Sequence, residues 1–197
     1  MGWLSGKSRW LRGTDMALII LDRDGVINQD SDDYVKSLAE WIPIPGSIEA
    51  IAKLSQAGYS IAIATNQSGL GRGYFQQSDL DAMHQRLVAL VEAAGGSIDH
   101  IAYCPHAPDD GCACRKPASG LIDTIEQALG VSAKGSYMVG DSLRDLQAGV
   151  SKGSLPVLVR TGKGERTLAK GDSLLDQAQV YDSLEAFSTA LLAKECC

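Results

Sequence analysis

The sequence predicts an α/β fold with three layers, in which a central parallel sheet carries helices on both faces. Short apolar runs typical of buried strands alternate along the chain with segments of helical periodicity, and no linker, repeat or low-complexity tract interrupts them. The composition is 45% hydrophobic and 21% charged, which is ordinary for a globular chain. A chain of 197 residues buries about 70% of the surface that its unfolded form exposes. We therefore expect one domain over residues 16–197.

Each expected strand is a short, continuous apolar run bounded by turn residues, as in strands buried on both faces of a sheet. The strands are expected at Leu18–Leu21, Ser60–Ala64, Ile98–Cys104, Ser136–Val139 and Leu155–Val159. Apolar residues at helical spacing predict helices at Ile48–Leu54, Leu80–Val91, Leu121–Leu129, Leu143–Val150 and Leu184–Leu191. Strands that alternate with helices form βαβ units, so the sheet should be parallel.

The start of the chain and its overall charge limit its partners. Residues 1–15 show no apolar period and are interpreted as a flexible extension, with an interaction arm using Trp3 and Trp10 as the alternative. No stretch reaches the roughly 18 apolar residues of a membrane span, and none near the start resembles a signal-peptide core. The net charge of −6 gives no reason to expect nucleic-acid binding. We expect a cytoplasmic monomer, because no amphipathic helix is left over for a partner.

Polar loops follow four of the expected strands. The first loop is Asp22–Gly25, the second is Thr65–Gly69, the third ends in Arg115–Pro117, and the fourth is Gly140–Asp145. Open parallel sheets bind ligands at the carboxyl ends of their strands. We therefore expect these four loops to meet in one site.

The first loop places two acidic residues close together. Asp22 and Asp24 are two residues apart, so both side chains can enter one pocket. Two crowded carboxylates repel each other unless a cation binds them or one is protonated, and Asp141 offers a third oxygen ligand suited to Mg²⁺. An isolated Asp-x-Asp-Gly is typical of a turn, but Thr65 and Lys116 in the matching loops favour a catalytic site.

A second cluster lies between the third strand and Lys116. It contains Cys104, His106, Cys112 and Cys114 within eleven residues. Three thiolates and one imidazole complete a tetrahedral set with no open position, which is typical of a structural zinc site. Free buried cysteines are the alternative. The two other cysteines, Cys196 and Cys197, are interpreted as part of an exposed tail.

The four loop motifs, in this order over residues 17–160, resemble the haloacid dehalogenase (HAD) superfamily of phosphotransferases. The resemblance implies that Asp22 is the nucleophile and forms an aspartyl-phosphate, while Asp24 acts first as general acid and then as general base. It further implies that Thr65 bonds the phosphoryl oxygens and that Lys116 neutralises their charge. Mg²⁺ would be held by the Asp22 side chain, the Asp24 backbone carbonyl and the Asp141 side chain, and Asp145 would either reach the metal through water or cap a helix.

The loop that carries the expected zinc ligands, Cys104–Cys114, narrows the resemblance to two branches of that superfamily. One acts on D-glycero-D-manno-heptose 1,7-bisphosphate, in ADP-heptose supply for lipopolysaccharide cores, and the other acts on histidinol phosphate. Residues Leu21–Asn28 and Thr65–Phe75 resemble the former, which implies removal of the 7-phosphate from a sugar bisphosphate. Histidinol-phosphate hydrolysis is the first alternative. A phosphatase that acts on nucleic-acid ends is the next alternative, but the net negative charge of the chain counts against nucleic-acid binding. A zinc-stabilised binding module with an inactive core is the alternative from another class, although inactive cores usually lose the nucleophile.

A sugar bisphosphate needs partners for its hydroxyls and second phosphate, and the resemblance implies that Arg115 is the recognition cation. Arg72, a bidentate donor on a glycine-flanked loop, is our candidate for the distal phosphate. Ser142 stands where relatives often have lysine. The connections are too short for a cap domain, so short loops should select the substrate. The expected substrate contacts are Arg23, Asp30, Asp33, Asn66, Gln67, Ser68, Arg72, Arg115 and Ser142.

Three further features have ordinary interpretations. His84 lies beside the apolar stripe of an expected helix, and His100 lies at the start of an expected strand. Each is interpreted as structural or solvated. The Lys163–Arg166 segment follows the fifth strand and either contacts substrate or crosses solvent.

Overall fold

The centre of the protein is a six-stranded parallel sheet with the strand order β3-β2-β1-β4-β5-β6. The chain is represented by a computed structural model that describes residues 17–195. The strands are β1 (Leu18–Leu21), β2 (Ser60–Asn66), β3 (His100–Cys104), β4 (Tyr137–Gly140), β5 (Leu155–Val159) and β6 (Gln179–Tyr181). The five strands expected from the sequence are confirmed, with ends that differ by at most two residues.

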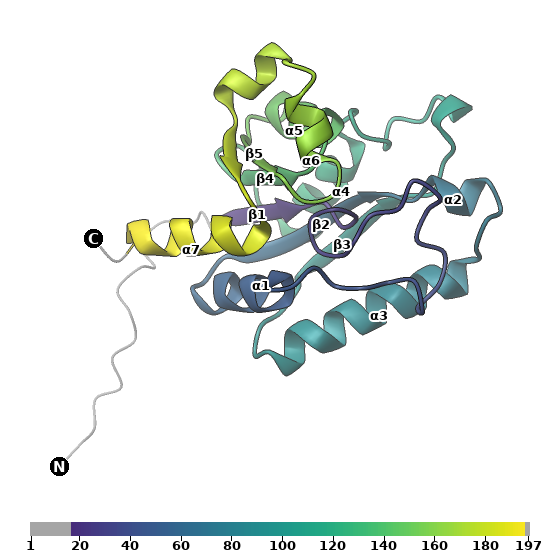
Figure 1. Cartoon of the computed structure of the whole chain (residues 1–197), viewed down its shortest axis with the longest axis horizontal. Helices are drawn as coiled ribbons and strands as arrows, with labels where there is room; N and C mark the ends of the chain where they lie inside the picture. The colour runs from purple at the N-terminus through teal and green to yellow at the C-terminus, as the bar shows by residue number, and fades with distance from the viewer. Residues whose placement is uncertain (1–16, 196–197) are drawn as a thin grey trace.

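The five expected helices are also confirmed. They are α1 (Ser47–Gln56), α3 (Gln77–Ala93), α4 (Gly120–Leu129), α5 (Leu143–Ser151) and α7 (Leu184–Glu195). Two short helices, α2 (Ser68–Gly71) and α6 (Gly164–Leu168), and the 3-10 turns Pro108–Asp110 and Ser173–Gln177 complete the described elements. Figure 1 shows α1, α3 and α7 on one side of the sheet and α5 on the other.

Alternation along each strand produces the three predicted layers. Ile19 and Leu21 of β1 pack in a buried cluster with apolar residues of α1, α3 and α7. Leu18 and Ile20 belong to a second buried cluster, which includes residues of α4 and α5. Because successive side chains of a strand point to opposite faces, a strand apolar at every position needs cover on both faces.

The sixth strand and the two shortest helices were not predicted. Strand β6 is three residues long and its central side chain, Val180, is exposed. An apolar run that short, at the edge of the sheet, carries no periodicity that distinguishes it from a loop. The same holds for α2 and α6, which are four and five residues long.

Two close approaches of the backbone bring the β1 and β5 loops together at the carboxyl end of the sheet. Gly25 has φ +84°, and a Cβ there would collide with the Asp141 carboxylate. Gly162 has φ +58° and faces the Gly25 backbone equally closely. Since only glycine tolerates both the positive φ and the lack of space, these residues let the two loops meet.

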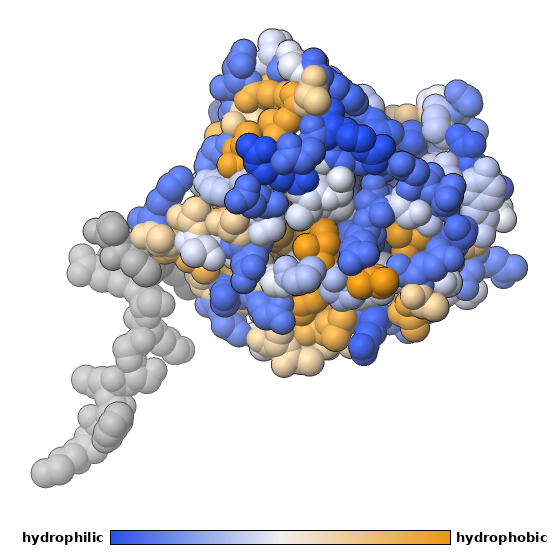
Figure 2. Space-filling model, in the orientation of Figure 1, coloured by the Kyte–Doolittle hydropathy of each residue, from blue (hydrophilic) through white to orange (hydrophobic). Residues whose placement is uncertain are grey.

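The surface of the described residues shows no extended apolar region in the view of Figure 2. Among residues 17–195, no helix is both long and apolar enough to cross a membrane. Figure 2 shows hydrophilic residues over much of the visible face, with apolar residues in separate small groups. The expected extension at residues 1–15 and the cysteines at 196 and 197 lie outside the described residues.

Candidate active site

A pocket of about 300 Å³ opens at the carboxyl ends of β1, β2 and β4. The loops after these strands and after β3 supply the residues expected to be catalytic, and all of them line it. The lining consists of Asp22, Asp24, Asp30, Ser31, Asp32, Tyr34, Val35, Thr65, Asn66, Gln67, Ser68, Pro108, Arg115, Lys116, Asp141, Ser142, Arg144, Asp145 and Lys163. The four motifs that are far apart in sequence therefore meet, as the sequence predicted.

Lys116 is the buried cation at the centre of the pocket. Its Nζ lies 2.9 Å from Asp22 Oδ1 and 2.6 Å from Asp145 Oδ1, and it donates to the Ala64 carbonyl at 2.6 Å. Burial alone would lower the pKa of Lys116, but the charges of Asp145 and Asp22 outweigh burial and raise it. The lysine is therefore charged and fixes the orientation of Asp22.

Three carboxylates crowd around this lysine. Oxygens of Asp22, Asp141 and Asp145 lie within 4.8 Å of one another. Burial and the charge of Asp145 raise the pKa of Asp22 to about 7. Burial and the charge of Asp22 raise the pKa of Asp141 to about 8. One lysine does not neutralise three carboxylates, so the cluster fits a divalent cation with oxygen ligands, such as Mg²⁺.

Asp145 has two contacts that the sequence left as alternatives. Its Oδ2 accepts hydrogen bonds from the Ser142 backbone N–H at 3.0 Å and from the Ser142 hydroxyl at 2.6 Å, which caps α5. Its other oxygen belongs to the cluster around Lys116. Asp145 therefore caps the helix and also reaches the candidate metal site, and Ser142 acts through this cap while lining the pocket.

The Asp24 side chain points to a different set of partners. Burial would raise its pKa, but the charge of Arg23 and hydrogen bonds from Asn28 and Gln67 lower it. Arg23 donates to both carboxylate oxygens, and Asn28 Nδ2 donates to Oδ1 at 2.8 Å. With its side chain held there, Asp24 has only its backbone carbonyl free for the expected metal contact.

The loop after β2 connects the two halves of the site. Gln67 Nε2 donates to Thr65 Oγ1 at 2.8 Å and to Asp24 Oδ2 at 2.9 Å. Asn66 Nδ2 donates to the Lys116 carbonyl at 3.1 Å, and its Oδ1 accepts from the Lys116 backbone N–H at 3.0 Å. Asn66 and Gln67 therefore position Lys116 and Asp24 in addition to lining the pocket.

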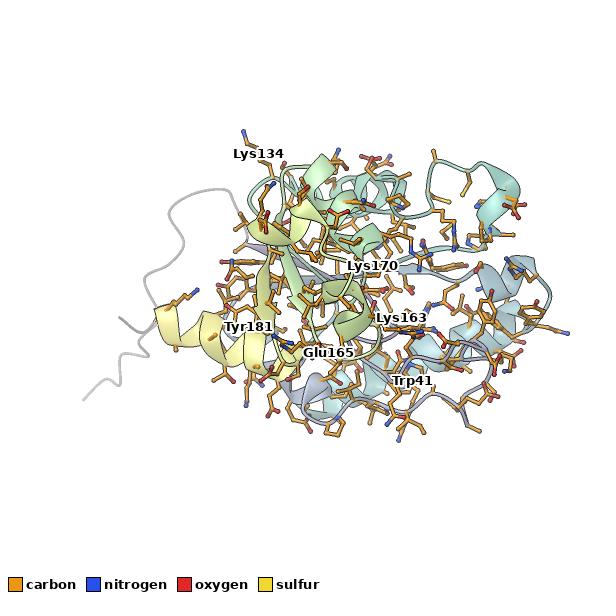
Figure 3. All side chains as sticks on the ribbon, turned by 45° about the horizontal axis from the view of Figure 1, so that its top comes forward. Trp41, Lys134, Lys163, Glu165, Lys170 and Tyr181 are labelled. Atoms are coloured by element: carbon orange, nitrogen blue, oxygen red, sulfur yellow. The ribbon has the colours of Figure 1, made fainter. Side chains whose placement is uncertain are left out.

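The segment after Asn28 forms one wall of the pocket. Asp30, Ser31, Asp32 and Tyr34 line the pocket. Lys163, labelled in Figure 3, lies just before α6 and forms an ion pair with Asp30, with Nζ–Oδ2 2.5 Å. Its backbone N–H also bonds Asp141 Oδ2 at 2.7 Å. Lys163 therefore joins this wall to the carboxylate cluster and lies in the pocket instead of crossing solvent.

Two further cations line the pocket. Arg115 and Arg144 both line it, and burial and the charge of Arg144 lower the pKa of Arg115. Among the described residues, neither has a carboxylate within ion-pair distance. The sequence analysis missed Arg144, although it lies three residues after Asp141 in a loop already identified. Two neighbouring guanidiniums without a counter-charge favour an anionic ligand.

Three expected substrate contacts lie outside the pocket lining. Arg23 is fully buried, because it alternates with Asp22 and Asp24 and so points away from the pocket. Arg72 is exposed just after α2, and Asp33 is exposed in a turn. For these three residues the structure does not support substrate contact.

The four expected zinc ligands converge in the loop after β3. Cys104 Sγ lies 3.6 Å from His106 Nδ1, 3.6 Å from Cys112 Sγ and 3.1 Å from Cys114 Sγ. Ligands about 2.3 Å from a tetrahedral zinc are spaced by roughly 3.8 Å. Burial raises the pKa of the Cys104 thiol to about 12, so this thiol keeps its proton unless a cation replaces it. The geometry fits a zinc ion directly before Arg115 and Lys116.

Together these features define a class of protein. A family model described as HAD-hydrolase-like matches residues 113–187. A crystal structure of D,D-heptose 1,7-bisphosphate phosphatase from B. bronchiseptica, complexed with magnesium and phosphate, aligns with a TM-score of 0.87 and 50% identity over 91% of this chain and 99% of that one. The sheet, loops and fit to this structure identify the chain as a HAD-type hydrolase.

Curated relatives narrow that class. The D-glycero-β-D-manno-heptose-1,7-bisphosphate 7-phosphatase of Pseudomonas putida is 54% identical over 90% of this chain and 100% of its own length. The enzyme of the same name from Pseudomonas aeruginosa is 56% identical over 89% of this chain and 98% of its own. The chain therefore belongs to the family of D-glycero-β-D-manno-heptose-1,7-bisphosphate 7-phosphatases.

We predict that Mg²⁺ stabilises the protein more at high than at low pH. Asp22 and Asp141 have pKa values raised from 3.8 to about 7 and about 8, so without metal the folded state binds more protons than the unfolded state at intermediate pH. The stability of the metal-free protein therefore falls as pH rises through this window. Mg²⁺ binds the deprotonated cluster, so its affinity rises over the same window.

Thermal unfolding with and without Mg²⁺ at about pH 6 and about pH 8.5 measures this linkage. The Mg²⁺-induced rise in Tm should be larger at the higher pH, and Asp141→Asn should reduce the difference. Equal rises at both pH values would contradict the assignment of the metal site to these carboxylates.

Proposed function

We propose that the protein removes the 7-phosphate from D-glycero-β-D-manno-heptose 1,7-bisphosphate through an aspartyl-phosphate on Asp22. The observation that carries this proposal is the pairing of two charge clusters in one pocket. Asp22 and Lys116 lie at its base, while Arg115 and Arg144 lie at its edge. A substrate with one reacting phosphate and one distal phosphate satisfies both clusters, and the names of the relatives support the choice of sugar and anomer.

In the first half of the reaction, an Asp22 oxygen attacks phosphorus and the bond to the sugar oxygen breaks. Asp24 donates a proton to the leaving alkoxide. Its hydrogen-bond donors favour the ionised carboxylate, but the negative charge of a bound phosphate favours protonation. In the second half, Asp24 takes a proton from the water that attacks the aspartyl-phosphate and releases phosphate.

Charge stabilisation accompanies both steps. Lys116 holds Asp22 and faces the phosphoryl oxygens, and the Thr65 hydroxyl lies at the end of β2 to bond them. Mg²⁺, held by Asp22, Asp141 and the Asp24 carbonyl, would neutralise charge on the phosphoryl group when bound. Phosphoryl transfer depends mainly on such positioning and electrostatic stabilisation.

The sugar would lie in the same pocket. Asp30, Asp32 and Tyr34 offer hydrogen-bonding groups on one side. Arg115 and Arg144 would bind the distal phosphate, because charge-assisted hydrogen bonds give orientation as well as affinity. Arg144 would thereby supply the positive charge that a lysine often supplies in relatives at the position of Ser142.

Zinc would be a structural ion in this enzyme. The loop that runs from Cys104 to Cys114 is irregular apart from one 3-10 turn, and it leads directly into Arg115 and Lys116. A closed Cys₃His site has no open position for a reaction. Zinc would instead fix the two cations that follow the loop.

The reaction would serve ADP-heptose supply for lipopolysaccharide cores, with the protein acting as a cytoplasmic monomer on a small sugar bisphosphate. The short loops at the pocket would then select the substrate. In residues 17–195, no separate cap domain interrupts the connections after β1 and β3.

Steady-state phosphate release with Mg²⁺ tests the function. The substrates are both anomers of the heptose 1,7-bisphosphate, fructose 1,6-bisphosphate and histidinol phosphate. We expect kcat/KM for the β-anomer to exceed that of every other substrate by at least about 10-fold, which is about 1.4 kcal/mol of transition-state discrimination. A preference for histidinol phosphate would refute the sugar assignment and leave the site chemistry intact.

Asp22→Asn is the matched control for that assay. It keeps the shape of the side chain but removes the nucleophile, so turnover should fall by roughly 10³-fold or more. Full turnover in this variant would exclude the aspartyl-phosphate.

Arg144→Gln tests the distal phosphate site, with Arg72→Gln as its matched control. Loss of one charge-assisted contact, about 1.5–3 kcal/mol, should lower kcat/KM for the bisphosphate by roughly 10- to 100-fold. The effect should be much smaller on p-nitrophenyl phosphate, which has no distal phosphate. Arg72 is exposed outside the pocket, so its variant should match wild type on both substrates. A larger loss in Arg72→Gln than in Arg144→Gln would reverse the assignment.

Cys112→Ser tests the zinc site, and Cys196→Ser removes a thiol outside the cluster as control. Metal analysis of protein purified without chelator should show about one zinc per chain in wild type and in the control. Cys112→Ser should lose zinc and unfold at a lower temperature. A zinc-free wild type, or unchanged stability in Cys112→Ser, would contradict the site.

A further inference from the structure

A buried arginine lies directly behind the pocket and has no part in the mechanism above. Arg23 follows β1, and its side chain is fully enclosed. Removing a guanidinium from water costs several kcal/mol unless its donors and its charge are satisfied inside the protein. The partners of Arg23 therefore indicate what it does.

Two nitrogens of the Arg23 guanidinium, Nε and Nη2, point at one carboxylate. Its Nε lies 3.1 Å from Asp24 Oδ1, and its Nη2 lies 2.9 Å from Oδ1 and 3.1 Å from Oδ2. Asn28 and Gln67 add one donor each, to Oδ1 and Oδ2 respectively. A planar guanidinium on a carboxylate restricts its orientation in a way that a single charge does not.

The opposite side of the guanidinium faces helix α3. Arg23 Nη1 lies 3.4 Å from His84 Nε2, and Nη2 donates to Gln67 Oε1 at 3.2 Å. Burial and the charge of Arg23 lower the pKa of His84 to about 4, so the ring is neutral and its Nε2 can accept this bond. The ring also packs beside Tyr103, with centroids 5.9 Å apart. His84 thus anchors Arg23 from outside the pocket.

We propose that Arg23 and His84 are positioning residues for Asp24, and that the chain of contacts from His84 through Arg23 holds the Asp24 carboxylate in the orientation that proton transfer needs. The inference rests on the proposed role of Asp24 as general acid and base. Proton transfer requires heavy atoms within about 2.6–3.2 Å, and a displacement of about 1 Å can cost roughly 10²-fold in rate. Arg23 itself does not touch substrate.

A substrate with a good leaving group distinguishes a misplaced Asp24 from a general loss of activity caused by a disturbed fold. A p-nitrophenolate ion leaves without a proton, so the first half of the reaction does not need Asp24. Hydrolysis of the aspartyl-phosphate still needs Asp24 as base. Misplacing Asp24 should therefore spare the first release of p-nitrophenol and slow every later turnover.

The test compares Arg23→Lys, which keeps the charge but loses the planar fork, with wild type in the presence of Mg²⁺. We expect the first-turnover burst of p-nitrophenol to remain within about 3-fold of wild type, while steady-state kcat falls by roughly 10- to 100-fold. KM should fall together with kcat, because kcat/KM reports only the steps up to release of p-nitrophenol, which the variant spares. On the heptose bisphosphate, both half-reactions need Asp24, so kcat should fall without a burst.

His84→Phe is the second variant, because it keeps an aromatic ring but removes the acceptor. It should show the same separation of burst and turnover at roughly 3- to 10-fold. His100→Phe is the matched control, since His100 lies at the amino end of β3, away from the loops that form the site, and it should equal wild type. If Arg23→Lys does not fold, as judged by its Tm, His84→Phe decides the question.

Two results would overturn the proposal: equal loss of burst and turnover in the folded variants, or no loss in either. The proposed function fails separately. If wild-type protein does not hydrolyse the heptose bisphosphate but still hydrolyses p-nitrophenyl phosphate, the substrate assignment falls while the burst experiment still reports on Arg23.

Discussion

Repulsion among buried carboxylates is the constraint on which the rest of the site depends. Asp22, Asp141 and Asp145 lie within 4.8 Å of one another at the carboxyl end of the sheet. Lys116 offsets part of this repulsion through contacts with two of them. Burial, together with the repulsion that remains, raises the pKa values of Asp22 and Asp141. A divalent cation would complete the charge balance, so a metal site follows from the electrostatics of the pocket.

The same constraint explains why irregular loops are held so firmly. Lys116 must reach the base of the pocket from a long connection after β3, and Asn66 bonds both of its backbone polar groups. The Cys₃His cluster shortly before Lys116 would fix the rest of that connection when it holds zinc. On the other side, Gly25 and Gly162 allow two loops to approach closely enough for Asp141 to join the cluster. The loops of the enzyme are therefore held by local side-chain and backbone contacts, because the hydrogen bonds of the sheet do not extend to them.

Most of the fold was predictable because its signals are local. Strands such as β1, apolar at every position, and helices with clear apolar stripes, such as α4, were located to within a few residues. Strand β6 was not, since three partly exposed residues at a sheet edge acquire their conformation from pairing with β5. The missed elements are three to five residues long, which is about one turn or one strand repeat and too short to show periodicity.

For the site, the sequence by itself determined which chemistry is present: the two aspartates of the first loop, the buried lysine and the Cys/His cluster are recognisable from residue type and spacing. Only the tertiary structure decided which remaining side chains face the pocket. It places Arg144 beside Arg115 and leaves Arg72 on the outer surface, and it turns Arg23 inward to hold Asp24. Residue type and spacing state what a side chain can do, but its direction depends on loops that pack against distant parts of the chain.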